Sequence, residues 1–323
     1  MNLTVFVSAV YFALIQGSVL ALISFAITLI FRTSTTTNFA QGMIATFTAY
    51  FSVWLLYKGF MVLDPDTYAN NVNGLKTLYS IICLICAIGL GFLMGLFVDS
   101  VIIRNSRFPN PASKQMITLG IVLIISGFIP VIFGPTFDSM YIPRALVSVP
   151  SNVNWIIQIG SGVNDTLRVD PNHVLTIGLS TVAIIGLFLI LKLSKWGLGV
   201  RSTAANEKVA GMVGVNTRSI TAISWSIAAG LGALGAFLYA PFAGSFNQGL
   251  MVAMQVNGFL AGVLGGFNTF AGPVLASYII AVTGNVFRSL NSVWGDFIMY
   301  ATVLLTCLIL PNGILGKKVQ RKV

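Results

Sequence analysis

Charged side chains are scarce in this sequence. Asp, Glu, Lys and Arg together make up 8% of its 323 residues, whereas soluble domains carry roughly 25%. Hydrophobic residues make up 56%, and the mean hydropathy is +0.90 over the whole length. These values exclude a soluble domain with a single apolar tail, and they indicate an integral membrane protein.

Ionisable side chains are absent from the middle of every long apolar run. Proton-driven carriers need such groups inside the membrane, so their absence weighs against proton coupling. Sodium coupling through the carbonyl groups of broken helices stays open. We also find no paired acids or metal ligands at a membrane interface, and we therefore do not expect an enzyme.

Histidine, cysteine and phosphate-binding motifs are equally sparse. The single histidine, His173, excludes a His-rich metal site. No G-x-x-x-x-G-K-[ST] motif is present, so any ATP and Mg²⁺ would bind to partner subunits and we expect no cofactor in this chain. Cys83 and Cys86 form a C-x-x-C inside an apolar run, which favours small buried side chains over a redox or metal motif.

Long apolar runs dominate what is present, and they predict an all-α fold of about eight or nine transmembrane helices. The ~10-residue alternation of a membrane barrel is missing. The seventh and eighth runs are shorter than ~20 residues, and they either cross tilted or form a re-entrant pair. We take residues 1–323 as one membrane domain. The nine predicted spans are Leu3–Phe31, Asn38–Tyr57, Leu75–Val98, Gln115–Phe133, His173–Leu191, Ile220–Tyr239, Met251–Leu264, Ala271–Thr283 and Phe297–Leu310.

Basic residues are distributed unevenly between the loops. With the N-terminus outside and nine crossings, 13 basic and 2 acidic residues fall on one side, against 5 basic and 6 acidic residues on the other. The net charges are +11 and −1. The positive-inside rule makes the first side cytoplasmic, which places the C-terminus there. The outer loop of residues 134–172 is long and proline-rich, and we expect it to be ordered and to face a partner.

One polar segment interrupts the apolar pattern, at residues 201–219 on the cytoplasmic side. Asn206 is a good N-cap residue, and the only glutamate, Glu207, would sit in the first turn, where the helix dipole favours an anion. Gly214 suits the left-handed position after a helix end. The two-turn helix between them is too short to be stable alone. Its apolar face, made of Val209, Met212 and Val213, must therefore pack on a partner, on its own bundle or on lipid headgroups.

The segment SKWGLGVRSTAANEKVAGMVGVNT (Ser194–Thr217) resembles the cytoplasmic loop of permeases from branched-chain amino acid ABC transporters. Gly197, Arg201 and Ala210 match that pattern, as does the run Gly214–Asn216. Lys208 stands where the family usually has Glu, and Val209 replaces the first Ala of its Glu-Ala-Ala. Three further stretches agree in order: ALISFAITLIFRTSTTTNFAQGMI, AGVLGGFNTFAGPVLAS and LPNGILGK.

The resemblance implies a permease domain whose cytoplasmic loop, residues 194–218, carries a coupling helix that docks on a separate ATPase. It implies two ATPase subunits, a second homologous permease, an extracytoplasmic solute-binding protein, and a location in the bacterial cytoplasmic membrane. The transported solute would be a branched-chain amino acid, with other small amino acids, amides and urea as alternatives. The implied coupling residues are Arg201, Glu207, Val209, Ala210, Met212, Val213 and Gly214.

Uncharged polar residues on or near the spans are candidates for the substrate path. A moving zwitterion needs weak, replaceable hydrogen bonds rather than fixed charge. The alternative is that these side chains only join helices to one another. From a different class, an ATP-independent channel, a Na⁺-coupled carrier or a non-transporting scaffold also stays open. The path candidates are Asn38, Gln41, Gln255 and Asn257.

Overall fold

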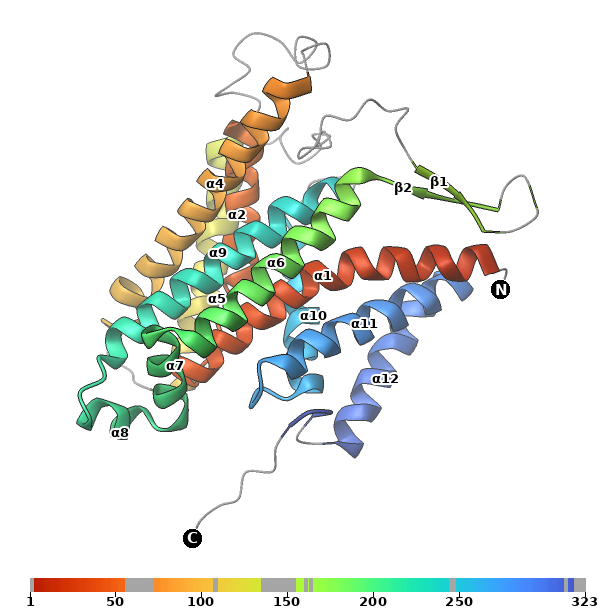
Figure 1. Cartoon of the computed structure of the whole chain (residues 1–323). Coiled ribbons are helices and arrows are strands. Elements are labelled where there is room, and N and C mark those ends of the chain that lie inside the picture. Colours follow the sequence, from red (N-terminus) through yellow and green to blue (C-terminus); the bar gives the residue numbers. More distant parts are fainter. Residues whose placement is uncertain are drawn as a thin grey trace.

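The computed structural model describes residues 3–55, 73–106, 110–134, 155–159, 162, 165–243, 248–310 and 313–316. This part is a helical bundle with one small hairpin of two strands (Figure 1). The elements are α1 (Leu3–Ser34), α2 (Gln41–Trp54), α4 (Asn73–Phe97), η2 (Val98–Ile103), α5 (Pro111–Phe133), β1 (Trp155–Gln158), β2 (Thr166–Val169), α6 (Pro171–Leu193), α7 (Lys195–Ala205), α8 (Glu207–Met212), α9 (Thr217–Ala243), α10 (Leu250–Gly265), α11 (Ala271–Leu290) and α12 (Gly295–Ile309).

Six helices are long and apolar enough to cross a membrane: α1, α4 with η2, α5, α6, α9 and α11. Two more apolar helices, α10 and α12, are shorter. The all-α membrane class is therefore confirmed, while the number of crossings and a re-entrant pair formed by α10 and α11 stay predictions.

Two predicted spans end at least five residues before the observed helices do. The eighth apolar run predicts a helix end at Thr283, but α11 continues to Leu290 and is 20 residues long. In these last turns the Asn285 amide donates to Gln16 of α1, and Arg288 pairs with Asp296 of α12. The third run predicts an end at Val98, but the helix continues as the π-helical segment η2 to Ile103.

Helix α1 lies at the centre of the bundle, in contact with α6, α9, α10 and α11 (Figure 1). In its most apolar stretch 83% of the residues are buried, against 22% in α5. The exposed apolar side chains of α4, α5 and α6 would face lipid or another subunit, because a membrane protein needs no polar surface there. The core is therefore built around the first helix of the chain.

Small residues allow a close contact between α4 and α9. A Cβ on Gly95 would lie 2.5 Å from the carbonyl oxygen of Trp225, and one on Gly91 would lie 2.9 Å from that of Ala229. Glycines four apart thus let the two backbones approach, as is common between helices in lipid. These glycines pack within a single bundle.

Two of the glycine-rich motifs meet between α10 and α11. A Cβ on Gly265 would overlap the backbone of Gly272, and Gly266 has a φ of +87°, which only glycine adopts freely. The Ile314 N–H donates to the Leu264 carbonyl at 2.7 Å. The C-terminal Gly-Ile-Leu-Gly stretch is thereby fixed against the turn that joins the two helices.

The loop of residues 134–172, predicted to lie outside, contributes the antiparallel pair of β1 and β2, with Trp155 opposite Val169. Asp165, just before β2, accepts a hydrogen bond from Thr4 of α1 at 3.0 Å. The strand pairing and this bond to α1 hold the described part of the loop, while order of the whole loop stays a prediction. Residues 135–154, which include Pro135, Pro143 and Pro150, lie outside the described residues, and a partner for the loop stays a prediction.

Candidate coupling helix and polar core

The short helix α8 lies at the end of the bundle opposite the N-terminus and the β-hairpin (Figure 1). Asn206 is its N-cap, as predicted: the backbone is extended there, and the side chain accepts a hydrogen bond from the Val209 N–H at 3.1 Å. At the other end Gly214 has a φ of +89°. The Val215 N–H bonds to the Ala210 carbonyl and the Gly214 N–H to that of Gly211, which together form a Schellman motif.

Three apolar side chains of this segment are exposed, although burial would stabilise them. Val209 is 51% exposed, Met212 80% and Val213 74%. Ala210 is different, because it is only 3% exposed and packs against its own chain. Its methyl group is therefore not free to fill a groove in a partner, and we assign it to holding α8 in place.

Arg201 of α7 contacts the chain itself. One guanidinium nitrogen donates to the carbonyl oxygens of Leu191 at 2.9 Å and Lys192 at 3.3 Å. A cation is favourable at these unpaired carbonyls in the last turn of α6. Arg201 thus fixes the angle between α6 and α7, and through α7 the place of α8; a contact with a partner stays a prediction.

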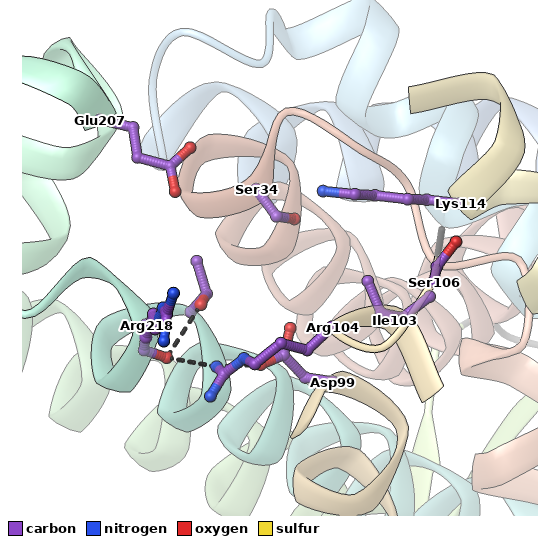
Figure 2. Close-up of a pocket in the computed structure, with 9 residues that line it drawn as sticks. Ser34, Asp99, Ile103, Arg104, Ser106, Lys114, Glu207 and Arg218 are labelled. Carbon is purple, nitrogen blue, oxygen red and sulfur yellow. Dashed lines mark hydrogen bonds and ion pairs between the residues drawn. The ribbon is translucent and has the colours of Figure 1, made fainter. Parts of the chain in front are cut away.

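A cavity of about 250 Å³ lies beside α8 (Figure 2). The Glu207 carboxylate points toward it from α8, and Lys114 faces it from the first turn of α5. Glu207 forms no ion pair with any described residue. The cavity is lined by Ser34, Asp99, Ile103, Arg104, Ser106, Lys114, Glu207, Arg218 and Thr221.

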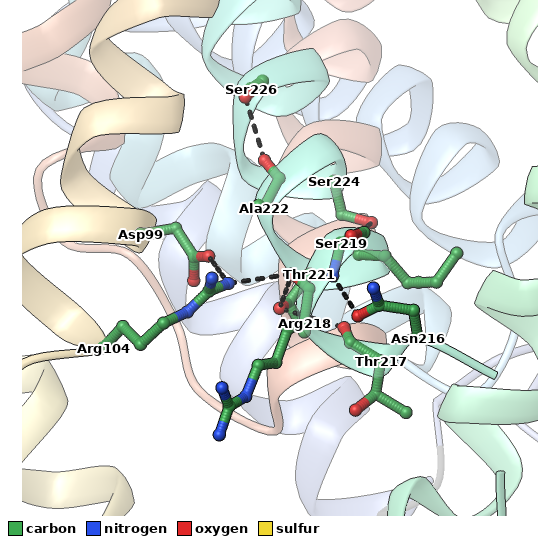
Figure 3. A network of polar contacts seen from close by, with 11 residues as sticks. Asp99, Arg104, Asn216, Thr217, Arg218, Ser219, Thr221, Ala222, Ser224 and Ser226 are labelled. Atoms are coloured by element: carbon green, nitrogen blue, oxygen red, sulfur yellow. Dashed lines mark hydrogen bonds and ion pairs between the residues drawn. The ribbon is translucent and has the colours of Figure 1, made fainter. Parts of the chain in front are cut away.

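An ion pair at this cavity, between Asp99 of η2 and the C-cap residue Arg104, is joined to α9 by a hydrogen bond (Figure 3). Arg104 donates to the Asp99 carboxylate at 3.0 Å and to the Arg218 carbonyl at 2.8 Å. Asp99 is 5% exposed and lies within η2, and π-helical turns are frequent at functional sites. Because Arg218 is in the first turn of α9, which follows α8, the pair ties the exit of α8 to the bundle.

This ion pair was not predicted from the sequence, because Asp99 directly follows the predicted end of a span at Val98. The available signal was an acidic residue inside an apolar run, with an arginine five positions later.

Three of the four path candidates form a buried network between helices. Gln41 of α2 donates to the Ala228 carbonyl of α9 at 2.6 Å, and it accepts from Asn38 at 3.3 Å. Gln255 of α10 accepts from the Gly42 N–H and donates to the Phe39 carbonyl at 2.8 Å. All three amide side chains are at least 92% buried. Their observed contacts fit the alternative function, joining helices.

The fourth candidate, Asn257, has a different environment. It accepts a hydrogen bond from the Tyr300 hydroxyl at 3.0 Å, and it lines a cavity of about 440 Å³. Asn38, Gln41 and Gln255 line neither this cavity nor the one beside α8.

A model of one protein family matches residues 9–307, and its description is "Branched-chain amino acid transport system / permease component". The chain belongs to this family. The permease is 27% identical over 312 residues to the high-affinity branched-chain amino acid transport system permease protein LivH of Salmonella typhimurium, with 95% of this chain and 94% of that protein covered.

Other relatives are similar over the same extent. The BraD permease protein of Pseudomonas aeruginosa, with the same descriptive title, is 24% identical over 314 residues, covering 95% and 94%. The probable branched-chain amino acid transport permease protein LivH of Methanocaldococcus jannaschii is 25% identical over 321 residues, covering 96% and 93%.

Among solved structures, PsaBC from Streptococcus pneumoniae in complex with Fab aligns with this permease at a TM-score of 0.47 and 15% sequence identity. The alignment covers 92% of this permease and 87% of the PsaBC chain. The resemblance expected from the four motifs is confirmed by the family model and the curated relatives.

Proposed function

We propose that this permease is the membrane-spanning subunit of an ATP-driven importer for branched-chain amino acids or related small amino acids. Two cytoplasmic ATPase subunits, a second homologous permease and an extracytoplasmic binding protein complete the assembly. The N-terminus faces outward, and α8 and the C-terminus face the cytoplasm. The family and the printed titles of the relatives support the solute class.

The observation that carries the proposal is the exposed apolar edge of α8, formed by Val209, Met212 and Val213. Both ends of α8 are capped, Ala210 anchors it, and Arg201 and the Asp99–Arg104 pair fix the elements around it. The helix is thus held rigidly while its apolar edge stays uncovered. Burial of that edge in a groove of an ATPase would stabilise the complex by roughly 4–9 kcal/mol before the costs of association.

Affinity purification in mild detergent tests the proposal, using the tagged permease expressed with the other subunits of its assembly. We expect two ATPase subunits with nucleotide-binding motifs to copurify with the unchanged chain. Val213→Asp places a charge in the buried contact, and Gly214→Pro is incompatible with a φ of +89°. Each should reduce recovery of the ATPase more than tenfold while membrane insertion is unchanged.

Matched controls separate these effects from general damage. Val213→Leu keeps an apolar side chain, and Gly214→Asn keeps a residue that tolerates left-handed geometry, so both should retain the ATPase. Undiminished recovery with Val213→Asp and Gly214→Pro would refute the role of α8. Solute transport in proteoliposomes by the chain alone, without nucleotide, would instead support the ATP-independent channel or carrier.

A further inference from the structure

A second cavity lies at the end of the bundle opposite α8, where α9 ends, α10 and α12 begin and α11 ends. Its volume is about 440 Å³, within the range of about 300–1,000 Å³ that is typical of small-molecule sites. Leu250, Ala253 and Met254 of α10 give it an apolar wall. Its remaining wall carries groups of both charges.

The charged wall is an ion pair between two helices. Arg288 of α11 donates to the Asp296 carboxylate of α12 at 2.6 Å. The side chains are 36% and 52% exposed, and ion pairs that are this accessible contribute little to stability. A ligand that brings a carboxylate and an ammonium group can therefore replace or join the pair without a large loss.

A buried amide with unused hydrogen-bonding capacity lies near this pair. Asn257 is 93% buried and accepts from the Tyr300 hydroxyl at 3.0 Å, but the other end of its amide has no partner in the described part of the chain. That end is not fully enclosed, because it is not among the buried side-chain atoms that lack a partner, so a ligand in the cavity can reach it. Gln255, two residues earlier, shows the contrast because both ends of its amide are bonded within the bundle.

We propose that this cavity is a zwitterion site that binds an α-amino acid on the outer side of the permease. The ligand carboxylate lies toward Arg288 and the free end of the Asn257 amide, since guanidinium and amide groups both donate to carboxylates. The ligand ammonium lies toward Asp296, and an aliphatic side chain rests on the apolar wall of α10. This inference rests on the proposed function and adds to it the residues that recognise the solute.

Equilibrium binding to the purified permease–ATPase complex in nanodiscs, without the binding protein, tests the site. The probes are L-leucine, leucinamide, which lacks the carboxylate, and 4-methylpentanoate, which lacks the ammonium. We expect Arg288→Gln to weaken leucine binding at least tenfold and to remove the preference for leucine over leucinamide. Asp296→Asn should weaken leucine binding similarly and remove the preference for leucine over 4-methylpentanoate.

Three further variants make the test specific. Arg168→Gln neutralises an exposed arginine on β2, outside the cavity, and should change nothing. Arg288→Lys keeps the charge and should retain the preference for leucine over leucinamide. Tyr300→Phe removes only the hydroxyl that holds Asn257, and it should weaken leucine binding several-fold without unfolding the protein.

If Arg288→Gln and Asp296→Asn each weaken the binding of all three probes equally, the proposal is overturned, because that result is expected for an ion pair with a purely structural role. Unchanged leucine binding in both variants would overturn it as well. Copurification with the ATPase is measured first, on the same preparations. If the ATPase copurifies but the leucine-binding results are not those expected, this inference alone is refuted. If the ATPase does not copurify with the unchanged permease, the proposed function is refuted.

Discussion

Helices α9 and α5 are both long and apolar enough to cross a membrane, yet they occupy opposite environments. In the most apolar stretch, 67% of the residues of α9 are buried and only 22% of those of α5. The more buried helix is the one rich in glycine, alanine and serine, whereas α5 carries more isoleucine, leucine and valine. Burial in this bundle therefore does not follow apolarity.

The reason lies in the solvent. Lipid tails are as apolar as leucine, so no hydrophobic gain drives α5 into the interior, and small residues are what allow α9 to meet its neighbours closely. Large apolar side chains of α5, such as Leu123 at 74% exposure, are left at the periphery. Between these two helices, the content of small residues rather than the hydropathy therefore indicates which one lies in the interior.

The largest effect is expected from a large side chain at the α4–α9 contact. Gly95→Leu would force its Cβ toward the Trp225 carbonyl and should destabilise the bundle by about 3 kcal/mol, the upper part of the usual range for overpacking. On α5, Gly120 has no atom within 4 Å of such a Cβ, so Gly120→Leu should change stability by less than about 0.5 kcal/mol. Thermal unfolding in detergent measures both, and equal effects would break the comparison.

A smaller effect is expected at the buried amides beside α9. Gln255→Leu leaves the Gly42 N–H and the Phe39 carbonyl without their partner and should cost about 2 kcal/mol. Val256, the next residue, is 52% exposed, and Val256→Ala serves as the control with little change. The same thermal assay applies; should Gln255→Leu unfold no earlier than its control, the network is not structural and a path role is favoured.

The smallest effect is expected at a glycine that is required for its positive φ and not because a side chain would clash there. A Cβ on Gly214 would have no neighbouring atom within 4 Å, but the φ of this residue is +89°. Gly214→Ala should therefore cost about 1 kcal/mol through strain alone, which would lower ATPase recovery about fivefold. Gly211→Ala, in the same helix and equally open, should not weaken recovery. A loss in Gly211→Ala as large as in Gly214→Ala would show that space, rather than φ, limits this helix.

Much of the architecture could be predicted from the sequence because lipid imposes simple rules. Backbone groups must be satisfied within each span, so apolar runs of sufficient length predict helices. The caps of α8 were equally predictable, since Asn206 and Gly214 act through bonds within a few residues. The predicted end of α11 is wrong where contacts with distant residues occur, such as the hydrogen bond from Asn285 to Gln16.

The candidate sites divide in the same way. Val209, Met212 and Val213 were identified from local spacing, but the burial of Ala210 depends on how α8 packs against its own chain. Asn38, Gln41, Gln255 and Asn257 look alike in the sequence, as uncharged polar residues in apolar surroundings. Their different environments depend on contacts with residues more than 40 positions away. Asn38, Gln41 and Gln255 join helices, whereas Asn257 bonds to Tyr300 at a cavity.

The sequence by itself determined the membrane class, the family, and the capped polar helix with its apolar edge, because composition and short-range hydrogen bonding act along the chain. Only the tertiary structure decided that α1 is central, that Asp99 and Arg104 hold the start of α9, and that Arg288, Asp296 and Asn257 share one cavity. These groups are brought together by helix packing, and helix packing in lipid depends on the fit of small residues rather than on a pattern that hydropathy records.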